Sequence, residues 1–329
     1  MIISRTPHRI SFFGGGTDYP DYYLKYGGKV LGTAIDKYCY LSVRKLPPFF
    51  KHKHRVVYSK MENVKSIDEI MHPSVRETLK YLEIDYGVSI HHDGDIPARS
   101  GMGSSSAFTV GLLNTMRALE GKRITKEEIT KEVIHIEQNL IKENVGSQDQ
   151  TFAAYGGFNK IDFIQNGEIL VEPIIIRNER LRKLEDSLML FFTGFSRIAS
   201  EVAGDKISNI PKISNNLLQM KNMVDDAYRI ITSENININE FGTLLNETWE
   251  LKKKLSERVT RPEIDELYET AIKNGAIGGK LCGAGDGGFM VLYVEPKNQN
   301  KVRESLKNYL FVPFKFDFEG SKIIVYNPS

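Results

Sequence analysis

Residues 97–107, PARSGMGSSSA, combine small residues and hydroxyls at a point where a strand leads into a helix. The run 88–91 alternates as a strand does, and the apolar residues of 108–119 recur at helical spacing. Gly101 and Gly103 would let backbone amides approach an anion closely, and the N–H groups of a first helical turn favour negative charge. The stretch therefore predicts a phosphate-binding loop. A serine-capped helix after an ordinary glycine turn is the simpler alternative.

Two acids follow this loop at positions where a carboxylate can do chemistry. Thr125, with Glu128 three residues later, forms a capping-box pattern that starts the next helix. On the wheel of that helix Glu137 falls within or beside the apolar stripe, where a carboxylate needs a partner. A metal ion is one explanation of it, and a salt bridge or a snorkelling residue at the edge of the stripe is an equally good one. Asp149 ends the polar stretch 144–149, and taken alone it is explained as a helix cap.

Two further glycine runs lie near the ends of the chain. Residues 9–18, RISFFGGGTD, place three glycines between a strand-like run and an acid. Residues 278–288, GGKLCGAGDGG, lead directly into the apolar strand 289–294. A hairpin or β-bulge is the simpler explanation of the first run, and a functional loop on a rigid strand is the other.

The elements around these runs predict an α+β protein of two domains. At 329 residues the chain exceeds the size at which one core usually keeps growing. A hairpin turn at 166–167 and a charged helical segment end the first part, so the predicted domains are residues 1–184 and 185–329. In the second part, a buried strand over 187–193, three helices and the strand 289–294 favour an antiparallel sheet with helices on one face. A helix and two strands are expected to complete the chain.

Composition limits the possible partners. With 44 basic and 42 acidic residues, the net charge of +2 does not point to nucleic acid, and the basic run 51–55 is interpreted as an exposed turn. No apolar run approaches the length of a membrane span, so no membrane partner is expected. Two distant cysteines and an N-terminus without a signal-peptide core indicate the cytoplasm. A monomer or homodimer is expected.

The three glycine runs, in this order and with an acid between the second and third, resemble the GHMP kinase superfamily. The matching segments are residues 9–18, 97–107 and 280–288. The resemblance implies an N-terminal ATP-binding domain like the second domain of ribosomal protein S5 and a ferredoxin-like C-terminal domain, with the active site between them. It also implies ATP and Mg²⁺ as cofactors and a phosphotransferase with an alcohol acceptor.

The same resemblance assigns roles to individual residues. Catalysis falls to Asp149 and Arg9, and magnesium binding to Ser105 and Glu137. The ATP-binding residues implied are Pro97, Arg99, Ser100, Gly101, Met102, Gly103, Ser104, Ser105 and Ser106. The substrate-binding residues expected are Gly14, Gly15, Gly16, Thr17, Asp18, Arg197, Lys280, Gly283, Ala284 and Gly285. None of the three motifs encodes a site for the acceptor phosphate. Arg197, just past the strand 187–193, is the first candidate for it and Lys280 the second, although a surface ion pair also explains Arg197.

Within the superfamily, Gly14-Gly15-Gly16 followed by Thr-Asp-Tyr-Pro resembles the D-glycero-D-manno-heptose 7-phosphate kinases. This implies phosphorylation of the anomeric hydroxyl of the heptose phosphate, on the way to GDP-heptose for surface polysaccharide. The alternatives are another sugar 1-kinase of the fucokinase or galactokinase type, and a sensor that binds sugar and ATP without turnover. Asp286 departs from the usual glycine of the third motif, and it is expected either to face away from the phosphates or to bind magnesium.

Overall fold

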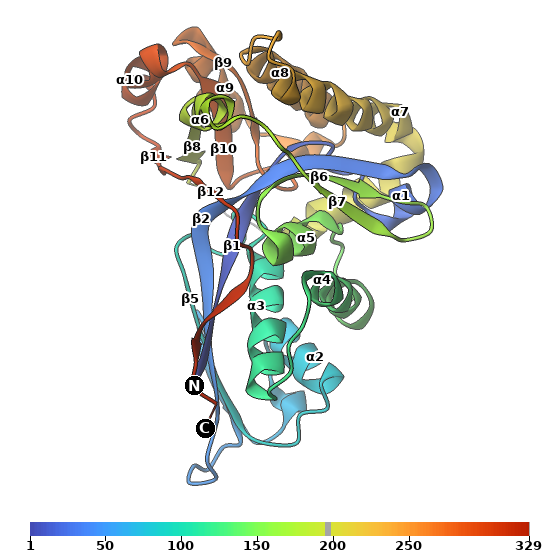
Figure 1. The fold of residues 1–329 in the computed structure, drawn as a ribbon, viewed down its shortest axis with the longest axis vertical. Coiled ribbons are helices and arrows are strands. Elements are labelled where there is room, and N and C mark those ends of the chain that lie inside the picture. The colour runs from blue at the N-terminus through green and yellow to red at the C-terminus, as the bar shows by residue number, and fades with distance from the viewer. Residues whose placement is uncertain (195–198, 329) are drawn as a thin grey trace.

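A computed structural model describes residues 1–194 and 199–328 (Figure 1). Nine strands form the larger sheet, along the order β13-β1-β2-β5-β3-β4, while β6 and β12 pair with β2 and β7 pairs with β6. Among the strands that the structure describes, only β3 and β5 run parallel. The strands of this sheet are β1 (Ile2–Phe13), β2 (Gly28–Lys45), β3 (His54–Val57), β4 (Met61–Val64), β5 (Val88–Gly94), β6 (Phe158–Phe163), β7 (Ile169–Pro173), β12 (Phe316–Asp317) and β13 (Lys322–Tyr326).

Helices cover one face of the long strands in this sheet (Figure 1). They are α2 (Pro73–Tyr81), α3 (Ser104–Leu119), α4 (Lys126–His135) and α5 (Gln148–Tyr155). Helix α1 (Pro20–Tyr26) lies near the edge of the same sheet. Helix α3 packs on β1 and β2, and its buried residues Leu112 and Met116 share a core with Leu41 and Ile90. The predicted strand at 88–91, the helix after the serines and the Thr125 capping box are confirmed. Helix α2 and the strands β3 and β4 were not expected from the pattern.

The second sheet has four antiparallel strands in the order β11-β8-β10-β9, as the alternation of strands and helices predicts. Its strands are β8 (Leu188–Phe192), β9 (Ala276–Leu281), β10 (Phe289–Val294) and β11 (Leu310–Phe311). The helices of this part are α6 (Asn178–Asp186), α7 (Ala199–Thr232), α8 (Glu240–Lys253), α9 (Pro262–Lys273) and α10 (Pro296–Ser305). Three short helical segments are Ile67–Glu69, Ile136–Leu140 and Glu257–Val259.

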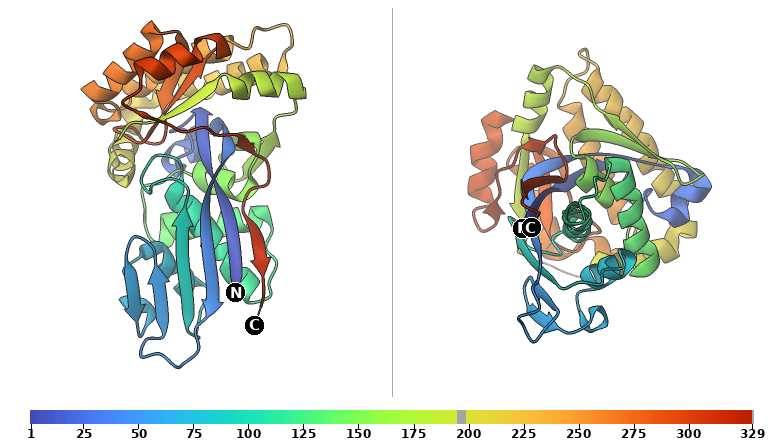
Figure 2. Two further views of the ribbon diagram at one scale, coloured as in Figure 1. Left: turned by 90° about the vertical axis from the view of Figure 1, so that its left-hand side faces the viewer. Right: turned by 60° about the horizontal axis from the view of Figure 1, so that its bottom comes forward.

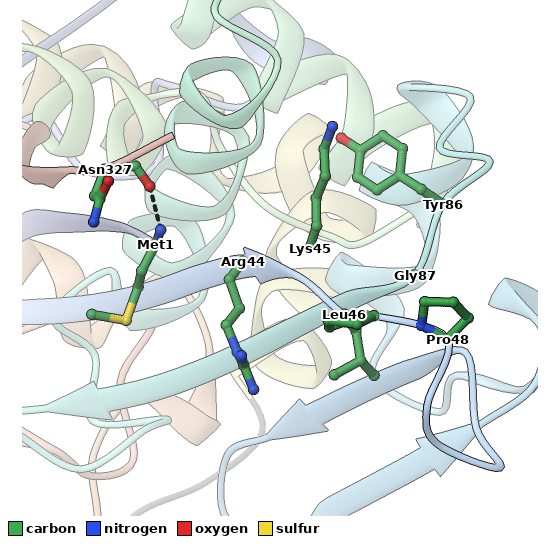
Figure 3. A pocket seen from close by; sticks show the side chains of 9 residues that line it. Met1, Arg44, Lys45, Leu46, Pro48, Tyr86, Gly87 and Asn327 are labelled. Atoms are coloured by element: carbon green, nitrogen blue, oxygen red, sulfur yellow. Dashed lines mark hydrogen bonds between the residues drawn. The ribbon is translucent and has the colours of Figure 1, made fainter. Parts of the chain in front are cut away.

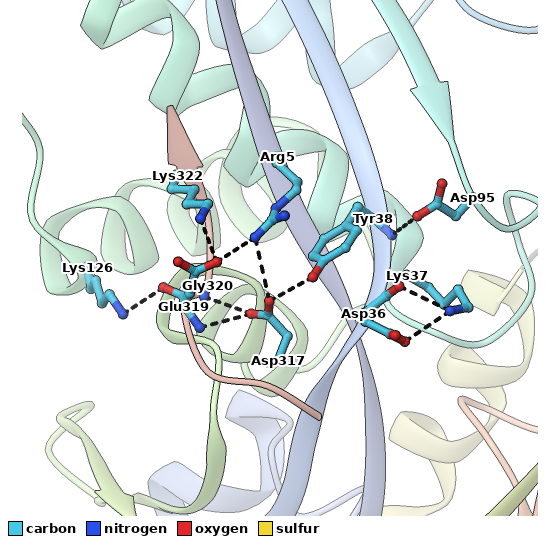
Figure 4. A network of polar contacts seen from close by, with 10 residues as sticks. All are labelled: Arg5, Asp36, Lys37, Tyr38, Asp95, Lys126, Asp317, Glu319, Gly320 and Lys322. Atoms are coloured by element: carbon cyan, nitrogen blue, oxygen red, sulfur yellow. Dashed lines mark hydrogen bonds and ion pairs between the residues drawn. The ribbon is translucent and has the colours of Figure 1, made fainter. Parts of the chain in front are cut away.

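The chain's last segment returns to the first sheet (Figure 2). Strand β12 pairs with β2, and β13 pairs with β1. With β11, three strands follow α10 where two were expected. Asp317, which is buried, accepts hydrogen bonds from the Tyr38 hydroxyl and from the Glu319 and Gly320 amides, each at 3.0 Å (Figure 4). The division at residues 184 and 185 remains a prediction, and residues 316–326 lie in the sheet of the first part.

A continuous apolar seam joins the two parts. Phe12 and Phe13, at the end of β1, both contact the ring of Phe241 in α8, with ring centroids 5.3 and 5.0 Å apart. All three side chains are fully buried. Since the loop 14–18 begins directly after Phe13, this seam fixes where the first glycine run lies. Across the described residues, we find no helix with both the length and the apolar character that a membrane crossing requires.

Candidate active site

Arg9 lies in β1, and its guanidinium joins two loops that are distant in the sequence. Its Nε donates to Asp149 Oδ1 at 2.8 Å, and its Nη2 donates to Asp149 Oδ2 at 2.7 Å. Its Nη1 donates to the Gly101 carbonyl at 2.8 Å. A planar guanidinium that holds both oxygens of a carboxylate fixes the orientation of that carboxylate. The predicted pair of Arg9 and Asp149 is therefore brought together beside the second glycine run.

Asp18 ties the first glycine run to the loop that carries Asp149. The Gly16 amide donates to Asp18 Oδ1 at 2.9 Å, and the Ser147 amide donates to the Asp18 carbonyl at 2.9 Å. A Cβ on Gly146 would lie 1.9 Å from Asp18 Oδ2, so any other residue there would displace the Asp18 carboxylate. Burial, reinforced by the nearby charge of Asp149, raises the pKa of Asp18. Asp18 is thus a buried brace of the loops.

The second and third glycine runs touch backbone to backbone. A Cβ on Gly101 would lie 2.7 Å from the Cys282 carbonyl oxygen, and one on Gly283 would lie 2.5 Å from the Gly101 Cα. A Cβ on Gly288 would lie 2.1 Å from the Ser100 carbonyl oxygen. These glycines are required by close packing between the runs. The three predicted motifs therefore form one assembled loop cluster.

Helix α3 begins within this cluster. Gly103 precedes it in the left-handed conformation, with φ of 73°, and no side chain caps the first turn. Arg99 is exposed, and its amide donates to Ser104 Oγ at 3.2 Å. The N–H groups of the first turn and the dipole of a 16-residue helix favour an anion at this end. The geometry fits the predicted phosphate-binding loop.

Glu137 lies behind the start of α3, in the π-helical turn that follows α4. Its Oε2 accepts from Ser106 Oγ at 2.8 Å and from Gln150 Nε2 at 2.5 Å, while its Oε1 is buried with no hydrogen-bond partner. Burial, together with the charge of Glu143, raises the pKa of Glu137 to about 7. The salt-bridge explanation of Glu137 finds no support among its described contacts, because its hydrogen-bond partners are neutral.

The structure pairs Glu137 with Ser106, where the resemblance implies Ser105. Ser105 is exposed, whereas Ser106 faces the interior. Successive residues of a helix point in directions about 100° apart, so only one of two neighbouring serines can face the carboxylate. Ser106 is therefore the serine that contacts Glu137, and the assignment of Ser105 to magnesium remains a prediction.

The family model of the GHMP kinase N-terminal domain matches residues 72–157. The family model of the GHMP kinase C-terminal domain matches residues 231–311. The chain is 32% identical to D-glycero-alpha-D-manno-heptose 7-phosphate kinase from Campylobacter jejuni, over 98% of this chain and 98% of that protein. The chain belongs to the GHMP kinases. Kinases of this family transfer a phosphoryl group from ATP to an alcohol, and the two-domain architecture expected from the resemblance is confirmed.

Two further proteins similar to this GHMP kinase are named after an L-fucokinase and a heptose 1-phosphate kinase. The L-fucokinase/L-fucose-1-P guanylyltransferase of Bacteroides fragilis is 27% identical over 93% of this chain, which spans 36% of that longer protein. A solved structure described as a D-glycero-D-manno-heptose 1-phosphate kinase from Bacteroides thetaiotaomicron superposes with a TM-score of 0.81 at 23% identity, covering 99% of this chain and all of that one. At this identity the superposition establishes the fold alone.

Two buried lysines hold the backbone of the loop cluster in this kinase. Lys280 donates to the carbonyls of Ser11 and Phe12 at 2.9 and 2.8 Å, and burial lowers the pKa of its ammonium group to about 8. Lys252 donates to the carbonyls of Leu281 and Gly283. Lys280 was expected to bind substrate, but its ammonium group contacts backbone instead. The sequence analysis did not identify Lys252. Its position three residues after Trp249, on the buried stripe of α8, is the sequence signal that could have identified it.

The remaining predicted residues lie around the same loops. Thr17 Oγ1 donates to the Gly14 carbonyl at 2.8 Å and so closes the first glycine run. Asp286 accepts from Arg261 Nε at 2.8 Å, so it is neutralised by an arginine that sequence reasoning missed. Arg197 lies outside the described residues.

Proposed function

We propose that this GHMP kinase transfers the γ-phosphoryl group of ATP to the anomeric (C1) hydroxyl of a sugar phosphate. The acceptor proposed is D-glycero-D-manno-heptose 7-phosphate, which would become the 1,7-bisphosphate. The observation that carries this proposal is the Arg9–Asp149 pair beside the uncapped start of α3, in a chain similar over its whole length to a heptose 7-phosphate kinase.

Asp149 is proposed to bind the attacking hydroxyl. Arg9 occupies one lone-pair direction on each Asp149 oxygen, and each oxygen retains another that can accept from a sugar hydroxyl. The side chain of Asp149 is 17% exposed, so it remains reachable, whereas Arg9 is 5% exposed. Arg9 thus orients the carboxylate, and Asp149 orients the hydroxyl or accepts its proton.

The phosphates of ATP are proposed to lie at the start of α3. The residues proposed to bind them are those of 97–106, chiefly through the amides of Gly101, Gly103 and the three serines. Gly14–Gly16, Thr17, Asp18 and Gly283–Gly285 are proposed to shape the acceptor side. Arg197 is proposed to bind the acceptor phosphate, and Arg197→Ala should raise KM for the sugar phosphate while KM for ATP is unchanged.

The residues around Glu137 fit a magnesium ion. Its Oε1 is buried without a partner, and burial raises the pKa of the carboxyl to about 7, so a cation would supply the missing charge. Glu137 with a serine of the first turn of α3, Ser106 or Ser105, would hold it. Bound there, magnesium would neutralise developing charge on the transferred phosphoryl group.

The experiment is an ATPase assay of the purified chain, coupled to ADP release, over a panel of acceptors. The panel contains heptose 7-phosphate, unphosphorylated heptose, L-fucose, galactose and mevalonate. We expect the highest kcat/KM with heptose 7-phosphate. A preference for L-fucose would favour the second candidate, a fucokinase-type sugar 1-kinase, for which the similarity to L-fucokinase is the specific observation. Binding of ATP and sugar without turnover would indicate a sensor and contradict the proposal.

A further inference from the structure

The connection between β2 and β3 is both basic and aromatic. Residues 44–55, RKLPPFFKHKHR, hold five lysines and arginines, two histidines and no acid, and we call them the basic tip. The connection projects at the end of the molecule where both termini lie, away from the second sheet (Figures 1 and 2). Since α3 begins in the loop cluster and runs toward this end, the tip and the candidate active site are at opposite ends of that helix.

The aromatic side chains of the basic tip are presented to solvent. Phe49 is 89% exposed, and Phe50 is 44% exposed. Phe50 is held in place, because its ring stacks on His52 with centroids 5.4 Å apart and the Arg55 guanidinium lies 5.2 Å above it. Two prolines, Pro47 and Pro48, precede the pair and restrict the backbone. Phe49 is therefore an exposed apolar ring in the basic tip, next in sequence to the held Phe50 and among cations.

The cations of the basic tip lack carboxylate partners. Within the described parts of the chain, no ion pair involves Arg44, Lys45, Lys51 or Lys53. Arg44 and Lys45 also line a hollow of about 680 Å³ at the base of the tip, together with Leu46, Pro47, Pro48 and Tyr86 (Figure 3). In it the Lys45 ammonium lies 4.8 Å from the centre of the Tyr86 ring. The hollow thus offers positive charge next to apolar surface.

We propose that the basic tip docks on an anionic lipid bilayer. Phe49 enters the boundary between headgroups and acyl chains, while Lys51, Lys53, Arg44 and Lys45 contact lipid phosphates. A bilayer is favoured over a protein partner because the contact is a single protruding loop, and a stable protein interface buries roughly 1,200–2,000 Å². It is favoured over nucleic acid because the apolar ring of Phe49 is 89% exposed, and a bilayer would bury it. Composition alone predicts no membrane contact, since it does not reveal that Phe49 is exposed.

The test is sedimentation of the purified chain with vesicles of phosphatidylcholine containing about 30% phosphatidylglycerol, with pure phosphatidylcholine for comparison. We expect binding to the anionic vesicles that weakens between about 20 and 150 mM salt. The double variant Lys51→Gln/Lys53→Gln should lower the partition coefficient about 30-fold, since each lysine near an anionic surface contributes about fivefold. Phe49→Ser should lower it about tenfold.

Matched variants make the result specific. Lys301→Gln/Lys307→Gln removes the same charge from exposed positions of the second part, and Phe318→Ser removes a ring that is 58% exposed elsewhere. Both should bind like the wild type, and all variants should keep kinase activity. Equal binding to neutral vesicles, or equal loss in the matched variants, contradicts the proposal. Tighter binding to a 20-nucleotide single strand than to vesicles, or self-association abolished by Phe49→Ser, would assign the tip to nucleic acid or to a second copy and overturn it.

Discussion

Asp149 and Glu137 lie on two sides of the same loop cluster, and they are held in opposite ways. Asp149 is partly exposed, and both its oxygens accept from a guanidinium. Glu137 is fully buried, accepts only from neutral groups, and has one oxygen without a partner. The first arrangement is complete within the protein, whereas the second lacks a positive charge. The comparison supports the proposed roles: Arg9 preorganises the carboxylate of Asp149, and a bound cation would supply the charge that Glu137 lacks.

The largest effect is expected from Asp149→Asn. The amide keeps the shape of the side chain but removes the charge that binds the acceptor hydroxyl, so kcat should fall about 10²- to 10⁴-fold. Affinity for a non-hydrolysable ATP analogue should be unchanged, because the phosphate loop is not touched. Steady-state kinetics and titration of the analogue measure the two quantities. Turnover equal to that of the wild type would show that Asp149 is only a structural partner of Arg9.

A smaller effect is expected from Arg9→Lys, which keeps the charge and removes the planar fork. Loss of one charge-assisted hydrogen bond costs about 1.5–3 kcal/mol, so kcat/KM should fall about 10- to 150-fold. The double variant Arg9→Lys/Asp149→Asn should be little worse than Asp149→Asn alone, because both changes disrupt the same Arg9–Asp149 pair. Additive losses in the double variant would mean that Arg9 acts separately from Asp149.

Local patterns predicted the segments that meet at this site. Thr125 and Glu128 form the expected capping box, and the helical wheel placed Glu137 on a buried stripe, where the structure has it. These features depend on neighbours within a few positions of the chain. The glycine runs could be located for the same reason, although why each glycine is needed became clear only from the contact between Gly101 and Gly283.

Features that depend on distant contacts could not be predicted. Residue type marked Lys280 as a cation for a phosphate, but packing places its ammonium group on the Ser11 and Phe12 carbonyls. No local pattern distinguishes Ser105 from Ser106, since the difference is which one faces Glu137. The return of β13 to β1 joins residues about 320 positions apart, as Ile2 pairs with Tyr326, and only tertiary packing determines it.

The proposed role of Glu137 in holding magnesium is tested by Glu137→Gln. The variant removes the charge proposed to hold magnesium, so the Mg²⁺ concentration for half-maximal activity should rise about tenfold or more. Ser106→Ala and Ser105→Ala are matched variants of neighbouring positions, and the serine that binds the metal should shift the same requirement. Thermal unfolding without metal separates this from a structural role. A Glu137→Gln protein that unfolds at a lower temperature than the wild type but needs the same Mg²⁺ concentration for activity would contradict the metal assignment.

The smallest effect concerns His8, the residue before Arg9. It is buried with neither ring nitrogen hydrogen-bonded, and burial, reinforced by the charge of Arg9, lowers its pKa from 6.5 to about 3. The folded state therefore binds this proton less readily than the unfolded state. The stabilising contribution is complete above pH 6.5 and is lost as the pH falls from 6.5 toward 3. At pH 5.5 the loss amounts to about 1.4 kcal/mol.

Comparing wild type with His8→Gln at pH 7.5 and 5.5 isolates this contribution, because other groups titrate equally in both proteins. The free energy of unfolding of the wild type should fall by about 1.4 kcal/mol more than that of the variant, measured by urea unfolding. The difference would link the acid sensitivity of the fold to the strand that carries Arg9, on the side of the cluster that is complete without a cation. An equal fall in both proteins would mean that His8 keeps an ordinary pKa, and that the interior around Arg9 is more accessible to water than its burial indicates.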